Sequence, residues 1–286
     1  MKLFQKNGFL LSLLLAPLAA LQFGCPNGGG GGTPDPDAGL YHTYAEIDAE
    51  LHALAANYPQ LAQVSSIGKS IEDRDLWAIK ISDNVASDEG EVVVALLGGH
   101  HAREWIAIDV PFLIAKHLLD NYASDAAIKN LVDNAEIWIV PLVNPDGHQH
   151  SVTSDRLWRK NRRNNGDGTF GVDLNRNYEH EWGGPGSSGS TFSEIYRGTA
   201  PFSEPETQAV RDFLQQNPPK ALISYHSYSQ LVLYPWGHTN APAPDETLLR
   251  DLSVAMADEI RAVHSVSYTP QQSSELYLAS SDTTDW

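Results

Sequence analysis

The sequence is poor in cysteine and in basic residues. Its single cysteine, Cys25, excludes an intrachain disulfide, so a folded domain must be stabilised by its hydrophobic core. The 286 residues include 36 acidic but only 19 basic side chains, which gives a net charge of −17 at pH 7. This balance argues against nucleic-acid binding and against adhesion to anionic membranes through a basic face.

Long apolar runs are also scarce, and the clearest one lies near the start of the chain. Residues 9–21 are almost wholly apolar and follow a short basic opening, but the run is too short for a comfortable transmembrane helix. This pattern is typical of a secretory signal. Cys25, a run of glycines and a Pro/Asp-rich stretch follow, as in a bacterial lipoprotein whose cysteine carries the lipid.

We therefore expect three segments: a signal peptide over 1–24, a Gly/Pro-rich linker over 25–40 and one domain over 41–286. The protein is then exported, either as a lipoprotein of the bacterial cell envelope anchored through Cys25 or by ordinary secretion.

The expected domain alternates helices and strands. Helical spacing of apolar residues predicts helices over 44–58, 105–122, 204–216 (with Ser203 as its cap) and 245–264. Apolar and β-branched runs predict strands over 75–82, 92–97, 135–143 (closed by Asn144–Gly147), 222–225 and 231–234. This alternation predicts an α/β fold, with a mixed, mostly parallel twisted sheet and helices on both faces.

The chemistry of the domain begins where the strand over 92–97 ends. Gly98 and Gly99 break the strand, and we expect His101 and Glu104 to lie on one side of a single helical turn. An imidazole and a carboxylate so placed can hold one metal ion, which then needs a third ligand. Such a pair also arises by chance on solvated surfaces. Its place at the carboxyl end of a buried strand favours a ligand site.

His226, at the end of another predicted strand, is the best candidate for the third ligand; the alternative is a satisfied core histidine. Arginines cluster between the two metal segments, including Arg159 and Arg176. A guanidinium binds a carboxylate through two parallel hydrogen bonds and can stabilise an oxyanion beside a metal. The alternative is a solvated basic face.

These segments resemble, in order, the motifs of the metallocarboxypeptidases of the carboxypeptidase A/B type. The matching stretches are His101–Glu104, Asn144–Gly147, Arg156–Lys160, Asp173–Asn177, His226–Gln230 with Tyr234–Gly237, and Leu276–Tyr277 with Asp285–Trp286. The resemblance implies a zinc carboxypeptidase fold over about residues 41–286. It also implies that the domain is a hydrolase that releases amino acids from the C-termini of peptides.

The resemblance also assigns roles to individual residues. His101, Glu104 and His226 bind one zinc ion, and Arg159 stabilises the developing oxyanion. Asn175 and Arg176 hold the terminal carboxylate of the substrate, and Tyr277 closes over the bound residue. We expect a monomer whose partners are peptide or protein C-termini.

Side-chain specificity is implied by a further set of positions. The late loop looks most like that of bacterial carboxypeptidase T, which accepts apolar and basic terminal residues. Tyr228, Asp282 and Thr284 are expected to bind substrate, and Asp282 could pair with a lysine or arginine. Leu233 and Ala279 favour apolar groups, so we expect broad specificity.

The sequence departs from the family pattern at its end. The general base of the family is a glutamate on a strand beyond the Asp-Trp pair, whereas this sequence stops at Trp286. We therefore expect a fragment of a longer enzyme, without the final strand and helix, that binds zinc but hydrolyses peptides poorly.

Two other functions remain open. One is a related zinc amidohydrolase that acts on peptidoglycan peptides or small N-acyl amino acids. The other is a non-catalytic binding protein that keeps the pocket and lacks the general-base glutamate. Asn175 and Arg176 together with Tyr277 favour the carboxypeptidase.

Overall fold

This computed structural model describes residues 39–286 of the chain. A five-stranded sheet forms the centre of this part. The helices are α2 (Tyr44–Asn57), α3 (Ile106–Asn121), α4 (Ala126–Val132), α5 (Pro145–Thr153), α6 (Pro205–Gln216) and α7 (Glu246–His264), with short 3-10 turns η1 (Leu174–Arg176) and η2 (Ser273–Glu275). The strands are β1 (Ala62–Lys69), β2 (Asp75–Ile81), β3 (Val92–Leu97), β4 (Ala135–Val140), β5 (Ala221–Ser224), β6 (Leu231–Tyr234) and β7 (Thr269–Gln272).

The central sheet has the strand order β1-β2-β4-β3-β5. Strand β3 pairs in parallel with both β4 and β5, whereas β2 is antiparallel to both β4 and β1. Only β2 therefore points against the other strands of this sheet. The predicted mixed, mostly parallel sheet is confirmed.

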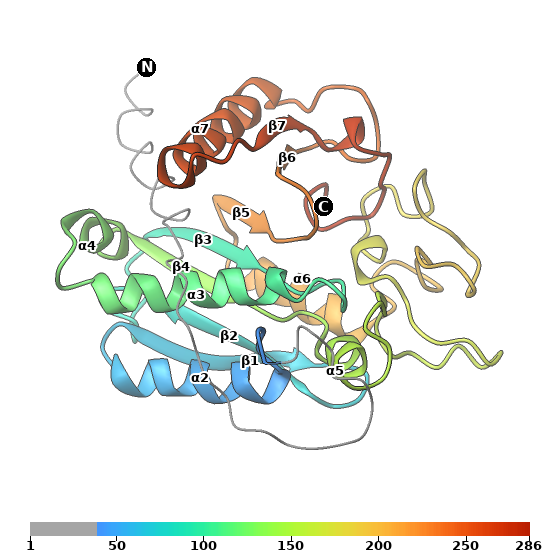
Figure 1. The fold of residues 1–286 in the computed structure, drawn as a ribbon, viewed down its shortest axis with the longest axis horizontal. Coiled ribbons are helices and arrows are strands. Elements are labelled where there is room, and N and C mark those ends of the chain that lie inside the picture. Colours follow the sequence, from blue (N-terminus) through green and yellow to red (C-terminus); the bar gives the residue numbers. More distant parts are fainter. Residues whose placement is uncertain (1–38) are drawn as a thin grey trace.

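Helices cover both faces of this sheet, as Figure 1 shows. On one face, α2, α3 and α4 bury an apolar core that includes Leu51, Phe112 and Leu131 together with Ile137 of β4. On the other face, α6 packs Val210 and its neighbours against side chains of β3 and β4. The predicted α/β fold with helices on both faces is confirmed.

A smaller element lies beside the main sheet. Strands β6 and β7 pair in parallel, and α7 packs against both of them (Figure 1). The predicted strand over 231–234 is therefore present. It belongs to this second, two-stranded sheet and not to the central one.

Two local predictions were wrong. Asn144–Gly147 does not simply close a strand: β4 ends at Val140, and Asn144 caps α5 by accepting a hydrogen bond from the Gly147 N–H (3.0 Å). Ser203 does not cap the next predicted helix. Helix α6 begins at Pro205 with Glu204 at the capping position, and the Ser203 hydroxyl instead donates to the Glu204 carboxylate (2.8 Å).

The predicted signal peptide, most of the linker and Cys25 lie outside the described residues. Between residues 39 and 286 no helix is both long and apolar enough to cross a membrane.

Candidate metal centre and substrate site

The candidate metal ligands come from the ends of two neighbouring parallel strands. Leu97 at the end of β3 lies opposite Ser224 at the end of β5. His101 follows β3 and His226 follows β5, so both side chains lie at the carboxyl edge of the sheet, where α/β proteins commonly bind ligands. The parallel pairing therefore brings together residues that are far apart in the sequence.

The turn between β3 and the first ligands requires glycine. A Cβ atom at Gly98 would lie 2.3 Å from the carbonyl oxygen of Ala107, and Gly99 has a φ of +65°. Glu104 then donates its backbone N–H to the carbonyl of His101 (3.2 Å), and helix α3 begins only at Ile106. The expected helical turn is thus a single hydrogen-bonded turn before the helix. It still directs both side chains to the same point.

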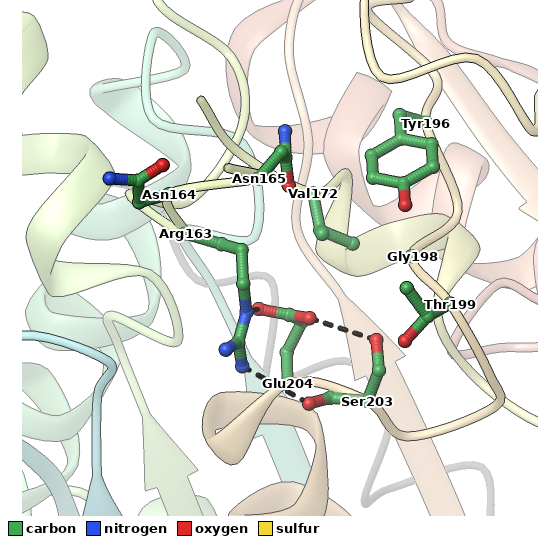
Figure 2. Close-up of a pocket in the computed structure, with 9 residues that line it drawn as sticks. All are labelled: Arg163, Asn164, Asn165, Val172, Tyr196, Gly198, Thr199, Ser203 and Glu204. Atoms are coloured by element: carbon green, nitrogen blue, oxygen red, sulfur yellow. Dashed lines mark hydrogen bonds and ion pairs between the residues drawn. The ribbon is translucent and has the colours of Figure 1, made fainter. Parts of the chain in front are cut away.

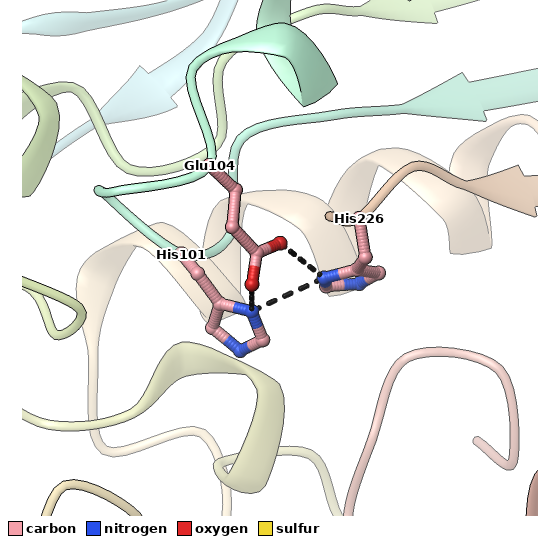
Figure 3. Close-up of side chains that lie close together, drawn as sticks. All are labelled: His101, Glu104 and His226. Carbon is pink, nitrogen blue, oxygen red and sulfur yellow. Dashed lines mark hydrogen bonds and ion pairs between the residues drawn. The ribbon is translucent and has the colours of Figure 1, made fainter. Parts of the chain in front are cut away.

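The three side chains converge tightly, as Figure 3 shows. Nδ1 of His101 lies 2.8 Å from Oε1 of Glu104. Nδ1 of His226 lies 3.1 Å from Nδ1 of His101 and 3.0 Å from Oε2 of Glu104. The side chains of His101 and Glu104 are buried, whereas that of His226 is 30% exposed. The cluster is therefore closed on the protein side and accessible beside His226.

This donor set fits a metal ion. Two imidazole nitrogens and a carboxylate face one another at distances at which a shared cation satisfies all three groups. Nitrogen and oxygen ligands suit zinc, and three protein ligands leave a position for water or substrate. Burial opposes the charge on Glu104, but His101 and His226 beside it hold the pKa of that carboxyl well below its ordinary value. Burial lowers the pKa of His226, which favours the neutral imidazole that metals require.

Asp173 supports this cluster from behind. Its Oδ1 lies 3.3 Å from Nε2 of His101, and its Oδ2 accepts hydrogen bonds from Nε (3.0 Å) and Nη2 (2.9 Å) of Arg159. Burial opposes ionisation, but the charge of Arg159, together with His101, holds the pKa of Asp173 well below its usual range. A carboxylate behind a ligating imidazole fixes the orientation of the ring. The sequence motif contains Asp173, but nothing in its spacing indicated this role.

The fold places Arg159 beside the cluster of candidate metal ligands. The side chain is buried, and its Nη1 lies 4.0 Å from Oε1 of Glu104. Its other two guanidinium nitrogens are occupied by Asp173. The planar group therefore has one edge fixed by a carboxylate and its remaining nitrogen directed toward the cluster.

Arg176 and Asn175 lie in η1, one short turn beyond Asp173. Arg176 is buried and donates from Nε to the carbonyl of Gly186 (2.8 Å) and from Nη1 to that of Asn175 (2.6 Å). Within residues 39–286, its Nη2 makes no hydrogen bond. The ring of Tyr277, which is 55% exposed, lies 6.0 Å from this guanidinium. The side chain of Asn175 already has partners, since its Oδ1 accepts hydrogen bonds from the N–H and O–H groups of Thr283 (3.0 and 2.9 Å).

The remaining predicted substrate residues lie in two places. Tyr228 is 95% exposed, and the N–H of Ser227 before it donates to Oε2 of Glu104 (3.1 Å). Asp282 is buried, and Thr284 follows it in the same tight turn. The Oδ1 of Asp282 closes this turn by accepting hydrogen bonds from Thr284 and from the Asp285 N–H. Burial, and then the charge of Asp285, raises the pKa of Asp282.

A separate cavity of about 220 Å³ lies beyond these residues and was not predicted from the sequence. Figure 2 shows its wall, in which Arg163 donates to Glu204 (2.8 Å) and to the Ser203 carbonyl (3.2 Å). None of the predicted site residues lines it. Because its one guanidinium is already paired, the cavity offers no free charge for a ligand.

Comparisons with known proteins show which family most of the chain matches. The model of the Peptidase_M14 family, described as zinc carboxypeptidase, matches residues 47–286. Carboxypeptidase B of Astacus astacus is 38% identical over 251 residues, which cover 86% of this chain and 81% of the relative. Carboxypeptidase A2 of Mus musculus is 36% identical over 251 residues, covering 87% of this chain and 59% of the relative.

Solved structures of carboxypeptidase-like proteins also match most of the chain. The crystal structure of thrombin activatable fibrinolysis inhibitor matches with a TM-score of 0.82 at 34% identity and covers 86% of this chain and 62% of that one. Carboxypeptidase A from Helicoverpa armigera matches with a TM-score of 0.79 at 32% identity, covering 86% and 61%. The chain thus spans about three fifths of the length of several proteins that it matches.

Proposed function

Because the chain belongs to the zinc carboxypeptidase family, we propose that it acts as a metallocarboxypeptidase that releases amino acids from the C-termini of peptides. In this proposal His101, Glu104 and His226 hold one zinc ion. The proposal rests on the convergence of these three ligands, at 2.8 to 3.1 Å from one another, beside the buried guanidinium of Arg159. Bound zinc in such a site lowers the pKa of a coordinated water and polarises a carbonyl group.

Arg159 supplies positive charge at the place where negative charge develops on the substrate carbonyl. Asp173 holds two of its nitrogens, so the guanidinium needs little reorganisation when the reaction occurs. The same carboxylate faces His101, so one buried group orients both a metal ligand and the cation. This shared support favours a fixed spacing between the metal and Arg159.

Arg176 and Asn175 bind the terminal carboxylate of the substrate. Two fixed hydrogen bonds hold the Arg176 guanidinium in place, and its Nη2 has no partner within residues 39–286. A charged donor that is held in this way suits a carboxylate better than a neutral amide. Tyr277, exposed and near this guanidinium, closes over the bound residue.

The terminal side chain is accommodated by Tyr228, Asp282 and Thr284, with Leu233 and Ala279 as apolar neighbours. Asp282 accepts lysine or arginine when it is ionised, and apolar residues are also accepted. We further propose that the protein works as a monomer. Its N-terminal sequence supports export, either anchored through Cys25 or freely secreted.

Binding of two peptides that differ only at the terminus tests the proposal. One has a free C-terminal carboxylate and the other a C-terminal amide, and each is titrated calorimetrically into the zinc-loaded protein. We expect the free acid to bind at least about tenfold more tightly, since hydrogen bonds to charged groups contribute about 1.5–3 kcal/mol. Arg176→Lys should remove most of this difference, whereas Arg211→Lys, at a partly exposed arginine on α6, should keep it.

Mass spectrometry of the free-acid peptide after incubation identifies the product. Any product is expected to lack the terminal residue alone, even where hydrolysis is slow, and peptides that end in phenylalanine or arginine should be preferred over one that ends in glutamate. Equal binding of acid and amide, or cleavage within the peptide, would contradict the proposed function. A clear preference for glutamate would contradict the proposed specificity alone.

A further inference from the structure

A second group of potential metal ligands lies outside the site described above. One ligand atom each from His180, Glu181 and His238 lie within 4.8 Å of one another. His180 and Glu181 belong to the segment that follows η1, and His238 follows β6. These two segments are far apart in the sequence and meet only in the fold.

His238 is oriented as a metal ligand would be. Its Nδ1 lies 2.7 Å from Oδ2 of Asp285, and the same carboxylate accepts the backbone N–H groups of Gly237 and His238. A ligating histidine commonly donates its other ring nitrogen to a carboxylate, which fixes the tautomer and the ring orientation. Asp285 thereby leaves Nε2 of His238 for a metal.

His180 carries an unsatisfied ring nitrogen. Its ring stacks on Trp236 with centroids 5.1 Å apart and lies 4.8 Å from the ring of His238. Within the described residues, its buried Nε2 has no hydrogen-bond partner. A buried polar atom without a partner is unfavourable, and metal coordination of this ring gives such an atom a partner. Glu181 beside it is exposed and can turn toward the same point.

We propose that His180, Glu181 and His238 form a second metal site, specific for a transition metal of the zinc type. Two imidazoles and one carboxylate suit zinc, whereas calcium and magnesium prefer ligand sets made of oxygen. The ligands of a tetrahedral zinc ion lie roughly 3.3 Å apart, given zinc–nitrogen bonds of about 2.0–2.1 Å. All three ligand atoms already lie within 4.8 Å of one another, so small side-chain rotations bring them to this spacing.

A metal at this place would join segments around the late loop. The backbone of Ser281 accepts a hydrogen bond from the Tyr178 N–H and donates one to the His180 carbonyl. The Gly237 carbonyl accepts a hydrogen bond from the Ala279 N–H (2.9 Å). Both segments that carry the ligands therefore contact residues 279–285. The ion would stabilise this loop in a domain that has no disulfide, and it would take no part in bond cleavage. Its effect on the substrate pocket rests on the proposed function; the metal site itself does not.

Counting bound metal tests the site directly. The protein and its variants are equilibrated with a small excess of zinc in the presence of a weak competing chelator, desalted and analysed by inductively coupled plasma mass spectrometry. We expect two ions per chain in the wild type, and one in His180→Gln, in His238→Gln and in Glu104→Gln. Loss of one ion in each single-site variant assigns the two ions to two separate sites.

A matched control excludes binding to surface carboxylates. Asp83, Glu89 and Glu91 form a third group of possible ligands, which is largely exposed and consists only of carboxylates. Glu89→Gln should still bind two ions. Retention of one ion by the His180 and His238 variants, with an unchanged circular dichroism spectrum, shows that they are folded. One ion in the wild type and none in Glu104→Gln would overturn the proposal, as would a second ion that survives both histidine substitutions.

Discussion

The two histidine clusters contain the same ligand types but are supported differently. His101, Glu104 and His226 extend from the ends of two paired strands, and their ligand atoms lie 2.8 to 3.1 Å apart. His180 and His238 extend from loops, and each ligand atom of their cluster lies within 4.8 Å of the others. One carboxylate supports each cluster, Asp173 the first and Asp285 the second.

This difference separates a site held by the ends of a sheet from a site held by loops. A sheet fixes the positions of its strand ends before any ligand binds, so the first cluster loses little conformational freedom on binding. Loops retain more freedom, so part of the binding energy at the second cluster is used to order them. We therefore expect zinc to fill the first cluster at lower concentration than the second.

The largest expected effect concerns the support of the first cluster. Asp173→Asn leaves the buried charge of Arg159 without its partner, which costs about 3–5 kcal/mol of folding free energy. Urea unfolding of the zinc-free protein measures this loss. Asp75→Asn is the control, because Asp75 pairs with the exposed Lys69 and its loss should have a far smaller effect. Equal losses in the two variants would show that Asp173 is not a structural support.

The next effect concerns a ligand itself. His226→Ala removes one of three protein ligands at the first cluster. Loss of groups that only orient ligands already costs about 10–100-fold in metal affinity, so we expect more than about 100-fold here. Competition titration with a chromophoric chelator measures the affinity. The exposed His52 provides a control, since His52→Ala should leave the tight phase of zinc binding unchanged. An unchanged tight phase in His226→Ala would place that metal elsewhere.

A smaller effect tests the support of the second cluster. Asp285→Asn removes the carboxylate that orients His238, and it should weaken zinc binding there by about 10–100-fold. The tight phase, which we assign to the first cluster, should not change. Isothermal titration resolves the two phases. If the tight phase weakened instead, the two clusters would be coupled and the comparison between them would fail.

A last expected effect is a difference in pH dependence between two buried carboxylates, Asp282 and Glu104. Burial, and then Asp285, raises the folded-state pKa of Asp282, so its contribution to stability is complete below about pH 4 and is lost as the pH rises through that pKa. Glu104 has a lowered pKa, so its contribution has the opposite sign. Each unit of raised pKa corresponds to about 1.4 kcal/mol.

Asp282→Asn isolates this effect, because asparagine keeps the oxygen that accepts from Thr284 and Asp285. Unfolding free energies of the zinc-free wild type and variant are compared at acid and neutral pH. The wild type should lose stability relative to the variant as the pH rises. A pH-independent difference would show that Asp282 does not titrate as we expect.

Much of the fold could be predicted from apolar patterning. Strand β3 and helix α7 lie within about one residue of their predicted bounds, because a continuous apolar run and a long helical stripe are strong local signals. Strand β1 was not predicted, because most of its residues are polar or only partly buried. The start of α5 was predicted only to close a strand, although asparagine before proline is also typical of a helix N-terminus.

The site was predictable where a motif marked it. His101 and Glu104 follow a buried strand at short spacing, and His226 ends another strand, so each could be named from local sequence. The support by Asp173 depends on how an irregular segment folds across the sheet edge, which has no periodic signal. His180 and His238 were missed for the same reason, since each lies in a loop and only tertiary folding brings them together.

The most direct test of the account is an anomalous difference map at the zinc edge from crystals of the zinc-loaded protein. We predict a strong peak between His101, Glu104 and His226, and a second peak between His180, Glu181 and His238 that appears at higher zinc concentration. A single peak at the first cluster at every concentration would contradict the second site. No peak between His101, Glu104 and His226 would contradict the proposed metal centre, and with it the proposed function.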